Sequence, residues 1–381
     1  MKILVVQDYL RSGGTERQSI LLANAFAAAG HDTRLLTFRP GGPLAGTVSP
    51  AAKHHALQPF DLGVDWFAPG LLRTVRRARP DIVLCMGRMA NCYVHRLAPL
   101  RRGARGIPQL QPSSARVVAT MRTGKSLPYW FRLGLRHADH VVANSAEARA
   151  TLGSRYAVPV EKTSVIHNSL VFPPESALWR NTALRAQHGA TSATNVLLCV
   201  AMFRPEKNQR ELIEIAGGLP EQPDWQLWLA GDGPARGACE QLVAAKGLGA
   251  RVKFPGFHRD PTPLYCAADL AVHASWSEAL SNFLIEAQAH GLPAVACDAQ
   301  GIRECFVPGR TGWSIARGDR AAFRAAVRAR MTEPAATRLE RAAEARAYAR
   351  AAFDPARQVA AYLELFSRLQ RDGNSTRPAP P

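Results

Sequence analysis

Two glutamates, Glu278 and Glu286, lie eight positions apart around the predicted start of a helix. Ser281 and Asn282 are both favourable N-cap residues, so the helix is expected to begin at one of them, with Phe283 in its first turn. The N–H groups at a helix start form a site for a phosphate-sized anion. Carboxylates beside such a site suit the neighbouring hydroxyl groups of a ribose or a sugar. A plain capped helix with one acidic residue is the alternative.

Two basic residues, Arg204 and Lys207, follow another apolar run at a predicted strand-to-helix turn. Spaced three apart, they can reach one diphosphate together, because arginine supplies forked hydrogen bonds and lysine a compact charge. A pair of solvated surface charges is the alternative, but the apolar residues 196–200 lead directly into the turn. The pattern therefore favours an anion site.

Glycines mark two further turns at which the backbone can approach a ligand closely. The sequence Gly231-Asp-Gly-Pro follows a predicted strand, and Pro234 is expected at the first position of the next helix. A dinucleotide-binding fingerprint is disfavoured, because its third glycine comes one position late, at Gly237. Gly13 and Gly14 precede another predicted helix, whose first N–H groups would point toward a ligand.

These segments require two sets of alternating strands and helices to position them. Strand-like apolar runs occur at residues 3–6, 33–38, 81–85, 117–121, 140–143, 164–166, 196–200, 225–230, 252–254, 270–273 and 294–297. Helical patterns occur at residues 15–29, 70–78, 209–218 and 234–246, and residues 321–370 are expected to be helical throughout. This β-α-β alternation predicts an α/β protein with two doubly wound parallel sheets, each covered on both faces.

Taken together, the motifs resemble those of the retaining glycosyltransferases of family 4, which have the GT-B fold of two Rossmann-like domains facing a cleft. Glu278 and Glu286 match the family's Glu-x7-Glu motif, and residues 204–208 match its Arg-x-x-Lys-Asn segment. The Gly-Asp-Gly-Pro turn at Gly231 and the Gly-Gly-x-Glu-Arg loop at residues 13–17 also match. The resemblance extends over nearly the whole chain.

The resemblance implies a role for each of these residues. Glu278 is expected to contact the donor sugar and Glu286 to hold the ribose. Arg204, Lys207 and the helix start at residues 281–283 are expected to stabilise the charge of the leaving diphosphate, and the glycine turns are expected to line the donor pocket. No Asp-x-Asp motif is present, so no metal is implied, and no cofactor is implied beyond the nucleotide sugar as co-substrate.

Three positions depart from the family's pattern. Ala279 stands where a glycine usually follows the first glutamate, and Ser169 replaces the glycine of an Asn-Gly pair. Arg122 holds the place of a histidine that contributes to the reaction centre in many members. Because an arginine cannot act as a base, Arg122 is expected to act electrostatically on the sugar, the acceptor or the phosphate. A basic surface residue is the alternative there. A later turn, Gly301-Ile-Arg-Glu, keeps the family's pattern.

The resemblance also suggests domain boundaries. Residues 1–175 are expected to form an acceptor domain and residues 195–355 a donor domain, joined by a linker at residues 176–194. Residues 356–370 are expected to form a helix that packs back on the first domain. Residues 371–381 are polar and rich in proline, so they are expected to be disordered.

The formal net charge of +18 is concentrated in the first half, where residues 1–175 carry 23 Lys/Arg and 10 Asp/Glu. Between Asp81 and Asp139 there is no acidic residue, and the ten basic residues there include Arg101 and Arg102. Such a block implies an anionic partner: a nucleic acid, an acidic membrane surface or a phosphorylated substrate. A solvated arginine-rich surface is the alternative.

Residues 128–136 combine aromatic residues and arginines, a composition that suits a segment at a membrane interface. We therefore expect peripheral association with the anionic cytoplasmic face of the inner membrane. The four apolar residues at the start of the chain are too few for a secretory signal, and the seven cysteines show no paired spacing. A cytoplasmic protein with reduced thiols is expected.

The implied activity is that of a retaining, metal-independent, hexosyltransferase-like enzyme. It would move a sugar from a UDP- or GDP-linked donor to a glycan or lipid-linked acceptor in lipopolysaccharide or exopolysaccharide biosynthesis. Another enzyme with the same fold, such as a nucleotide-sugar epimerase or a phosphorylase, is one alternative. A basic nucleic-acid-binding protein is the other, but the chain has no recognisable module for reading nucleic acid, so no nucleic-acid partner is expected.

Overall fold

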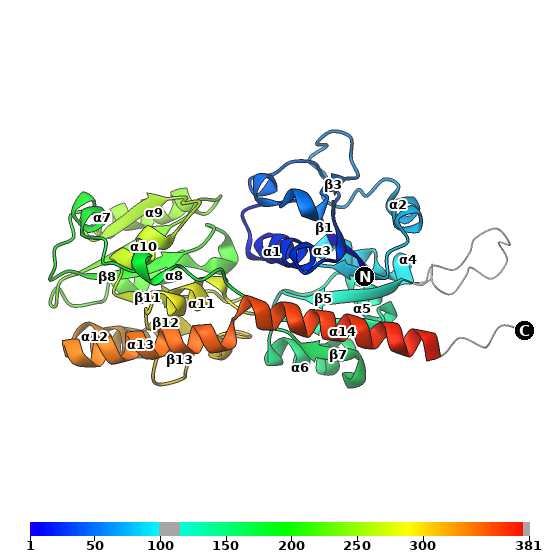
Figure 1. The fold of residues 1–381 in the computed structure, drawn as a ribbon. Coiled ribbons are helices and arrows are strands. Elements are labelled where there is room, and N and C mark those ends of the chain that lie inside the picture. The colour runs from blue at the N-terminus through cyan, green and yellow to red at the C-terminus, as the bar shows by residue number, and fades with distance from the viewer. Residues whose placement is uncertain (99–114, 376–381) are drawn as a thin grey trace, which may run out of the picture. The chain divides into compact units, whose positions relative to one another are not determined.

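The computed structural model describes residues 1–98 and 115–375, so Arg101 and Arg102 of the basic stretch lie outside the described residues. The chain divides into two compact units (Figure 1). The first is Met1–Ser169 together with the C-terminal segment that starts at Pro355, and the second is Leu170–Asp354. Of the helices in the described ranges, none is long and apolar enough to cross a membrane.

The first unit is built on one parallel sheet, whose described strands have the order β3-β2-β1-β4-β5-β6-β7. The strands are β1 (Lys2–Gln7), β2 (Asp32–Thr37), β3 (His55–Ala56), β4 (Ile82–Cys85), β5 (Arg116–Met121), β6 (His140–Ala143) and β7 (Thr163–Val165). β1 and β4 are neighbours, with Ile3 opposite Ile82, where the strand order reverses. This order is that of a doubly wound sheet, as predicted. The edge strand β3 was not predicted, because two residues show no alternation.

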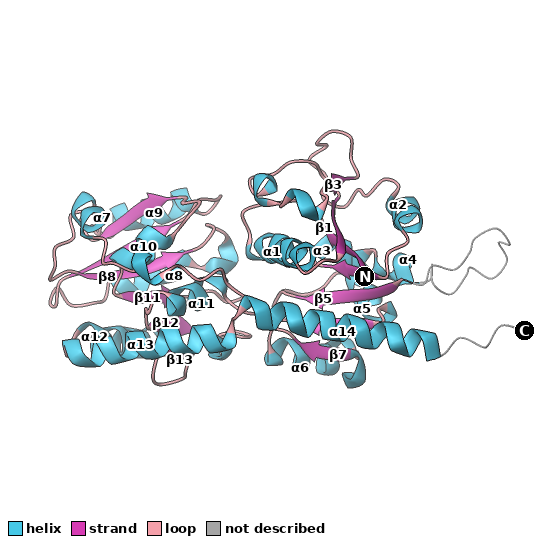
Figure 2. Cartoon of the chain, viewed as in Figure 1, coloured by secondary structure: helices cyan, strands magenta, loops and turns pink. Residues whose placement is uncertain are grey.

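Helices cover both faces of this sheet (Figure 2). They are α1 (Gly14–Ala28), α2 (Leu71–Ala78), α3 (Arg88–Cys92), α4 (Val94–Leu97), α5 (Tyr129–His137), α6 (Ala146–Tyr156) and α14 (Pro355–Ser375). Because the side chains of β1 alternate, Val5 packs in a core with Phe26 of α1 and Tyr362 of α14, whereas Leu4 packs in the core of the opposite face. The rings of Phe26 and Tyr362 meet edge to face, with centroids 6.2 Å apart, so α14 is packed against α1.

The second unit repeats this plan, with a parallel sheet whose described strands have the order β10-β9-β8-β11-β12-β13. Its strands are β8 (Asn195–Val200), β9 (Trp225–Ala230), β10 (Val252–Gly256), β11 (Leu270–His273), β12 (Ala294–Cys297) and β13 (Gly312–Ile315). Its helices are α7 (Thr182–Gln187), α8 (Gln209–Ala216), α9 (Arg236–Ala245), α10 (Thr262–Ala267), α11 (Asn282–Ala289), α12 (Arg320–Met331) and α13 (Ala335–Ala352). β8 and β11 are neighbours, with Leu197 opposite Leu270, and the strand order reverses between them. The second doubly wound sheet is confirmed as well.

Several helix boundaries differ from the expected ones, mostly at prolines. The region 321–370 is divided among α12, α13 and α14, because Pro334 and Pro355 lack a backbone N–H and cannot continue the preceding helix. Pro334 is the N-cap of α13, and Pro355 is the first residue of α14. α14 continues to Ser375, into the segment expected to be disordered, whereas residues 376–381 lie outside the described residues. α9 begins at Arg236, so Pro234 lies in the preceding turn.

Residues 176–194, the expected linker, carry α7 and are anchored in the second unit. Arg185 of α7 is only 2% exposed and donates to the carbonyl oxygen of Ala267 at 2.6 Å. The same guanidinium pairs with Asp269 at 3.0 Å, and the Asn181 side chain caps the helix. A buried, paired arginine fixes this segment to the sheet, so it is built into the second unit.

Candidate active site

The candidate site lies at the carboxyl edge of the second sheet, where the loops that follow β8 and β11 meet. In an open α/β sheet, the point at which the strand order reverses leaves a crevice at this edge, and ligands bind there. The loop after β8 carries Arg204 and Lys207, and the loop after β11 carries Glu278. The topology therefore brings together segments that are about 70 residues apart in the sequence.

Lys207 and Glu278 are in direct contact across the two loops. The Lys207 Nζ donates to Glu278 Oε1 at 2.6 Å. The Glu206 carbonyl oxygen also accepts from the Ser275 hydroxyl at 2.9 Å and from the Trp276 N–H at 3.1 Å. Three hydrogen bonds thus tie the two loops to each other and fix the lysine beside the acid.

Glu278 is a buried carboxylate with two donors. His273, the last residue of β11, is fully buried, and its Nε2 lies 2.9 Å from the Oε1 that Lys207 also contacts. Burial alone raises the pKa of Glu278, but the charge of Lys207 and the hydrogen bond from His273 outweigh it and lower the pKa to about 2. The carboxylate therefore stays ionised over the whole physiological range.

The helix α11 begins where the spacing of its polar residues indicates. Ser281 is the N-cap, and its side chain accepts from the Leu284 N–H at 3.4 Å. Asn282 and Phe283 are the first two helical residues. Glu286 lies on the second turn, half-buried, and its Oε2 accepts from the Tyr265 hydroxyl at 2.6 Å. Both glutamates and the helix start thus belong to one continuous segment, but the two carboxylates have different partners.

Arg204 is at the start of the 3-10 turn Pro205–Lys207, with an extended backbone and a partly buried side chain. Its carbonyl oxygen accepts from the Lys207 N–H at 2.9 Å, so the turn presents both basic residues from the same edge. Asn208 closes the turn in the left-handed conformation, at φ +53°. Both basic side chains therefore start from one tight turn at the carboxyl edge of the sheet.

Gly231 and Gly233 act as packing residues beneath this loop. Both have positive φ, and a Cβ at Gly231 would lie 2.1 Å from the Ala201 carbonyl oxygen. A Cβ at Gly233 would lie 2.5 Å from the carbonyl oxygen of Phe203. Only glycine permits the turn after β9 to pack against residues 201–203, which lead directly to Arg204.

Gly301 supports the second loop in the same way. It has φ +74°, and a Cβ there would lie 1.9 Å from the Ala279 carbonyl oxygen. The turn that begins at Gly301 therefore packs against the residue that follows Glu278. Ala279, the departure from the family's glycine, is 3% exposed and is accommodated in this contact.

The first unit carries the remaining predicted residues. Gly13 is the N-cap of α1 and Gly14 its first residue, and Gly13 has an ordinary φ of −78°. A Cβ at Gly13 would lie 2.4 Å from Glu16 Oε2, so the absent side chain leaves room for the glutamate in the first turn of α1. Asp8 follows β1 at the same sheet edge, and its carboxylate accepts from the N–H groups of Met89 at 2.9 Å and Ala90 at 2.7 Å.

Arg122 is held in a polar network within the first unit. Its Nη1 donates to Asn168 Oδ1, and its Nη2 donates to the hydroxyl of Tyr362 in α14 at 3.2 Å. Ser169, the other departure near this point, donates its hydroxyl to Gln358 of α14 at 2.7 Å. Arg122 therefore carries a fixed charge whose hydrogen bonds go to the protein itself.

Three residues near the two sheet edges were missed by sequence reasoning: His273, Tyr265 and Asp8. His273 and Asp8 had a usable signal, since each is a polar residue at or just after the end of an apolar strand, where ligands of parallel sheets bind. Tyr265 lies in α10 among apolar residues and had none. Within the described ranges, no group of three or more His, Cys, Asp or Glu side chains is placed to hold a metal ion.

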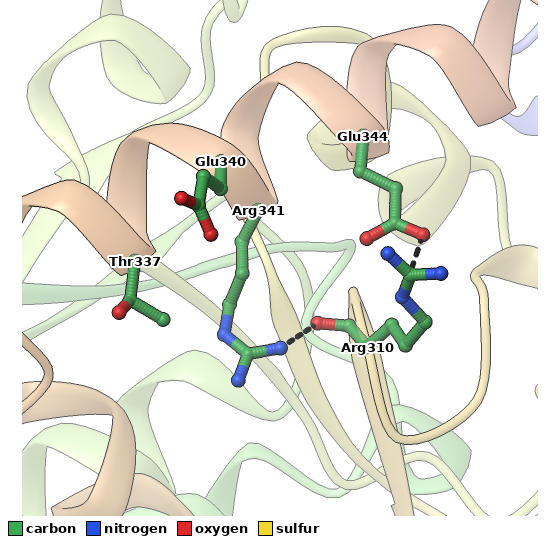
Figure 3. A pocket seen from close by; sticks show the side chains of 5 residues that line it. All are labelled: Arg310, Thr337, Glu340, Arg341 and Glu344. Atoms are coloured by element: carbon green, nitrogen blue, oxygen red, sulfur yellow. Dashed lines mark hydrogen bonds and ion pairs between the residues drawn. The ribbon is translucent and has the colours of Figure 1, made fainter.

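A separate pocket lies beside α13 in the second unit (Figure 3). It is lined by Arg310, Thr337, Glu340, Arg341 and Glu344. Arg310 pairs with Glu344 at 2.9 Å, and Arg341 donates to the Arg310 carbonyl oxygen. Its charged groups therefore compensate each other, and its lining contains none of the predicted site residues.

Comparisons with known families match both units. Residues 180–351 match the model of the family described as glycosyl transferases group 1, and residues 12–170 match that of glycosyltransferase family 4. A relative from Rhizobium meliloti, the lipopolysaccharide core biosynthesis glycosyltransferase LpsE, is 28% identical over 323 residues, which cover 83% of this chain and 85% of the relative.

Solved structures also match, over nearly the whole chain. Anabaena Alr3699/HepE in complex with UDP-glucose matches with a TM-score of 0.78 at 23% identity, over 97% of this chain and 100% of that one. WaaG, a glycosyltransferase involved in lipopolysaccharide biosynthesis, matches with a TM-score of 0.71 at 18% identity, over 96% of this chain and 99% of its own. The predicted GT-B fold is confirmed.

Proposed function

We infer, since this chain belongs to the group 1 and family 4 glycosyltransferases, that its second unit binds a nucleotide diphosphate sugar and that the sugar is transferred with retention of configuration. The observation that carries the site assignment is the 2.6 Å contact between Lys207 and Glu278 at the reversal point of the second sheet. A cation and a buried acid at this edge fit a ligand that has both a diphosphate and hydroxyl groups.

The leaving diphosphate sets the main electrostatic requirement. The bond from the anomeric carbon to the diphosphate oxygen breaks, and its electron pair stays with the diphosphate. The acceptor oxygen forms the new bond on the same face, and its proton leaves with the diphosphate. Lys207, Arg204 and the N–H groups of Asn282 and Phe283 would stabilise the developing charge, and one well-placed donor of this kind contributes about 3–4 kcal/mol.

The two glutamates would bind the hydroxyl groups on either side of the diphosphate. Glu278 is ionised, buried and next to Lys207, which suits the hydroxyls of the donor sugar. Glu286 lies one helical turn further from the helix start, which suits the ribose. UDP is the favoured nucleotide, since a structural neighbour of the chain binds UDP-glucose.

The first unit would supply the acceptor side of the reaction. The helix start at Gly13 and Gly14 offers first-turn N–H groups, and the Glu16 carboxylate lies beside Gly13. Arg122 would act as a fixed positive charge, because its guanidinium is already held by Asn168 and Tyr362. We propose no role for it as a base.

Donor binding is tested by thermal-shift measurements with UDP, GDP and a panel of their sugars, followed by mass analysis of the transferred or hydrolysed product. Stabilisation by one nucleotide series and release of the matching nucleoside diphosphate are expected. A chain that neither binds nor turns over any nucleotide sugar would overturn the proposal.

The acceptor is proposed to be a surface glycan or its lipid-linked precursor at a membrane. Two similar proteins are described as lipopolysaccharide glycosyltransferases. Six of the large apolar side chains that the first unit exposes come from residues 60–67 and 129–130: Phe60, Leu62, Trp66, Phe67, Tyr129 and Trp130. We call these six residues the interfacial face.

Contacts within the first unit connect the two parts of the interfacial face. The Tyr93 hydroxyl donates to the Trp66 carbonyl oxygen at 2.7 Å, and the His95 ring stacks on Trp130 with centroids 4.9 Å apart. Tyr93 is the N-cap of α4 and His95 lies within that helix, so one short segment carries both contacts. The exposed arginines Arg132 and Arg136 of α5 add positive charge, and aromatic residues next to basic ones favour an anionic membrane surface.

Flotation with vesicles of phosphatidylcholine, with or without phosphatidylglycerol, tests this part of the proposal. We expect the protein to float with anionic vesicles at low salt, and the Trp66→Ser, Trp130→Ser double variant to lose most of this binding. Trp179→Ser is the control, because Trp179 is 78% exposed but lies in the second unit. Equal flotation of the double variant and wild type would count against the interfacial face.

A further inference from the structure

Each acid of the candidate donor site is held by one buried aromatic side chain. His273 Nε2 lies 2.9 Å from Glu278 Oε1, and the Tyr265 hydroxyl donates to Glu286 Oε2 at 2.6 Å. His273 is 0% exposed and Tyr265 is 1% exposed, so the two aromatic groups that contact the acids are both buried. Neither aromatic residue is part of the motifs that carry the proposed chemistry.

The two aromatic residues are connected through Phe283, at the start of α11. The Tyr265 and Phe283 rings are stacked with centroids 6.1 Å apart. The Phe283 ring also contacts the His273 ring, and those two centroids are 5.5 Å apart. His290 stacks on Tyr265 at 4.5 Å and extends the row. We call these four rings the aromatic row. Two of its members, His273 and Tyr265, contact the carboxylates, and close packing restricts the rotation of the rings.

Under the proposed function, the Lys207 ammonium interacts with two anionic groups. It contacts Glu278, and it would also stabilise the donor's diphosphate. When the ammonium turns toward the phosphate, Glu278 needs another donor, because an unpaired buried carboxylate is strongly disfavoured. His273 contacts the same carboxylate oxygen and stays fixed in the aromatic row.

We propose that His273 and Tyr265 are positioning residues with separate effects. His273 keeps the Glu278 carboxylate in place while Lys207 is shared with the phosphate, and Tyr265 orients Glu286 toward the ribose. The inference rests on the proposed function. Ribose binding is the same in the ground state and the transition state, so loss of the Tyr265 bond weakens nucleotide binding. The charge that draws Lys207 to the phosphate grows in the transition state, so loss of the His273 bond lowers kcat.

The test compares Tyr265→Phe, His273→Leu and His273→Gln by calorimetric binding of UDP and GDP and by kcat and KM with the active nucleotide sugar. Tyr265→Phe is expected to weaken nucleotide binding about tenfold and to change kcat less than about twofold, the effect of one hydrogen bond to a charged group. His273→Leu is expected to lower kcat by at least about tenfold with nucleotide affinity nearly unchanged. His273→Gln is expected to recover most of kcat, because its amide N–H₂ can reach the place of Nε2.

Two controls report the loss of comparable groups elsewhere in the second unit. Tyr348→Phe removes a hydroxyl that donates to the Glu304 carbonyl oxygen at 2.8 Å, and His188→Leu removes a half-buried ring that meets Trp228 at 4.7 Å. Both should leave kcat and nucleotide affinity unchanged. If His273→Leu fails to fold, His273→Asn replaces it, since its shorter amide does not reach Glu278.

The possible outcomes distinguish a failure of the proposed positioning roles from a failure of the proposed glycosyltransferase function. Wild-type protein that binds neither UDP nor GDP would contradict the proposed function. Wild-type protein that binds and transfers, with site variants that behave like the two controls, would overturn the inference alone. Glutamine at position 273 that performs no better than leucine or asparagine would also overturn it, because packing and not a hydrogen bond would then explain the effect.

Discussion

The Nζ atom of Lys207 lies 2.6 Å from Oε1 of Glu278, and the same oxygen lies 2.9 Å from Nε2 of His273. One carboxylate oxygen thus joins a loop after β8, a loop after β11 and the end of β11 itself. Because the acid is buried, this arrangement sets both its charge and its position. The position of the Lys207 ammonium therefore also depends on His273, which contacts the same oxygen of Glu278.

Replacement of Lys207 by methionine should abolish most transfer. The methionine keeps the length of the side chain but removes the charge that would stabilise the leaving diphosphate. We expect kcat/KM to fall by about 10²–10³, the effect of one well-placed donor. Steady-state kinetics with the active nucleotide sugar measures this loss, and circular dichroism checks that the fold is retained.

Lys246→Met is the matched control for this change. Lys246 is the C-cap of α9 in the same unit, and it pairs with Glu214 of α8 at 3.1 Å. Its loss should leave kcat/KM within about twofold of wild type, because such partly exposed pairs contribute little. Full turnover by Lys207→Met would remove the basis of the site assignment.

Replacement of Glu286 by alanine should chiefly weaken binding of the nucleotide. The variant loses the acceptor proposed for the ribose hydroxyls and also the carboxylate that accepts from the Tyr265 hydroxyl. We expect UDP or GDP affinity to fall about 10- to 100-fold, in line with hydrogen bonds to a charged group. Calorimetric titration measures it, with Glu240→Ala as control, since Glu240 pairs with Arg236 on the surface of α9. Unchanged nucleotide affinity would exclude Glu286 from the donor site.

The sequence predicted most of the two sheets because each buried strand is a short apolar run between turn residues. The expected runs at 196–200 and 270–273 correspond to β8 and β11 within one residue. Ser281 was also identified as a candidate N-cap, since its side chain can accept from the helix start. These features are local, so residue type and spacing are sufficient to predict them.

Contacts between distant segments could not be predicted in this way. The Lys207–Glu278 pair spans 71 positions and depends on the strand order, not on spacing. The Tyr265–Glu286 bond depends on how α10 packs beside α11, and a tyrosine in an apolar helix looks like any core residue. Gly301 was noted as part of a motif, but its close approach to Ala279 appears only when the turn is packed.

Replacement of Gly301 by alanine should displace the loop that carries Glu278. The new Cβ would lie 1.9 Å from the backbone oxygen of Ala279, which no side-chain rotation can relieve. Gly318→Ala is the control, because Gly318 also has positive φ, +85°, but a Cβ added there would have nothing within 4 Å. Both variants should lose about 1–2 kcal/mol of stability to the left-handed backbone. Gly301→Ala should lose more than this because of its backbone clash, and only Gly301→Ala should lose most activity as well. Thermal unfolding and kcat measure the two effects, and equal activity of the variants would contradict the loop's role.

Asp8 should make the first unit less stable as the pH rises. Burial raises the pKa of Asp8 to about 6, although the N–H groups of Met89 and Ala90 oppose this shift. Between the ordinary value of 3.8 and about 6, the folded state binds more protons than the unfolded state, so stability falls with rising pH and levels off above that window. The stability of Asp8→Asn relative to wild type should therefore rise by about 2 kcal/mol between about pH 4.5 and about pH 7.5.

Urea unfolding across this pH range measures the difference, and Asp298→Asn serves as the control. A hydrogen bond from Arg303 lowers the pKa of Asp298, so that carboxyl is ionised throughout the range and its variant should show no such rise. The comparison isolates Asp8, because both changes remove one carboxylate and keep the side-chain volume. A pH-independent difference for Asp8→Asn would mean that this carboxyl is ionised in the folded protein across the whole range, and that its two backbone hydrogen bonds outweigh its burial.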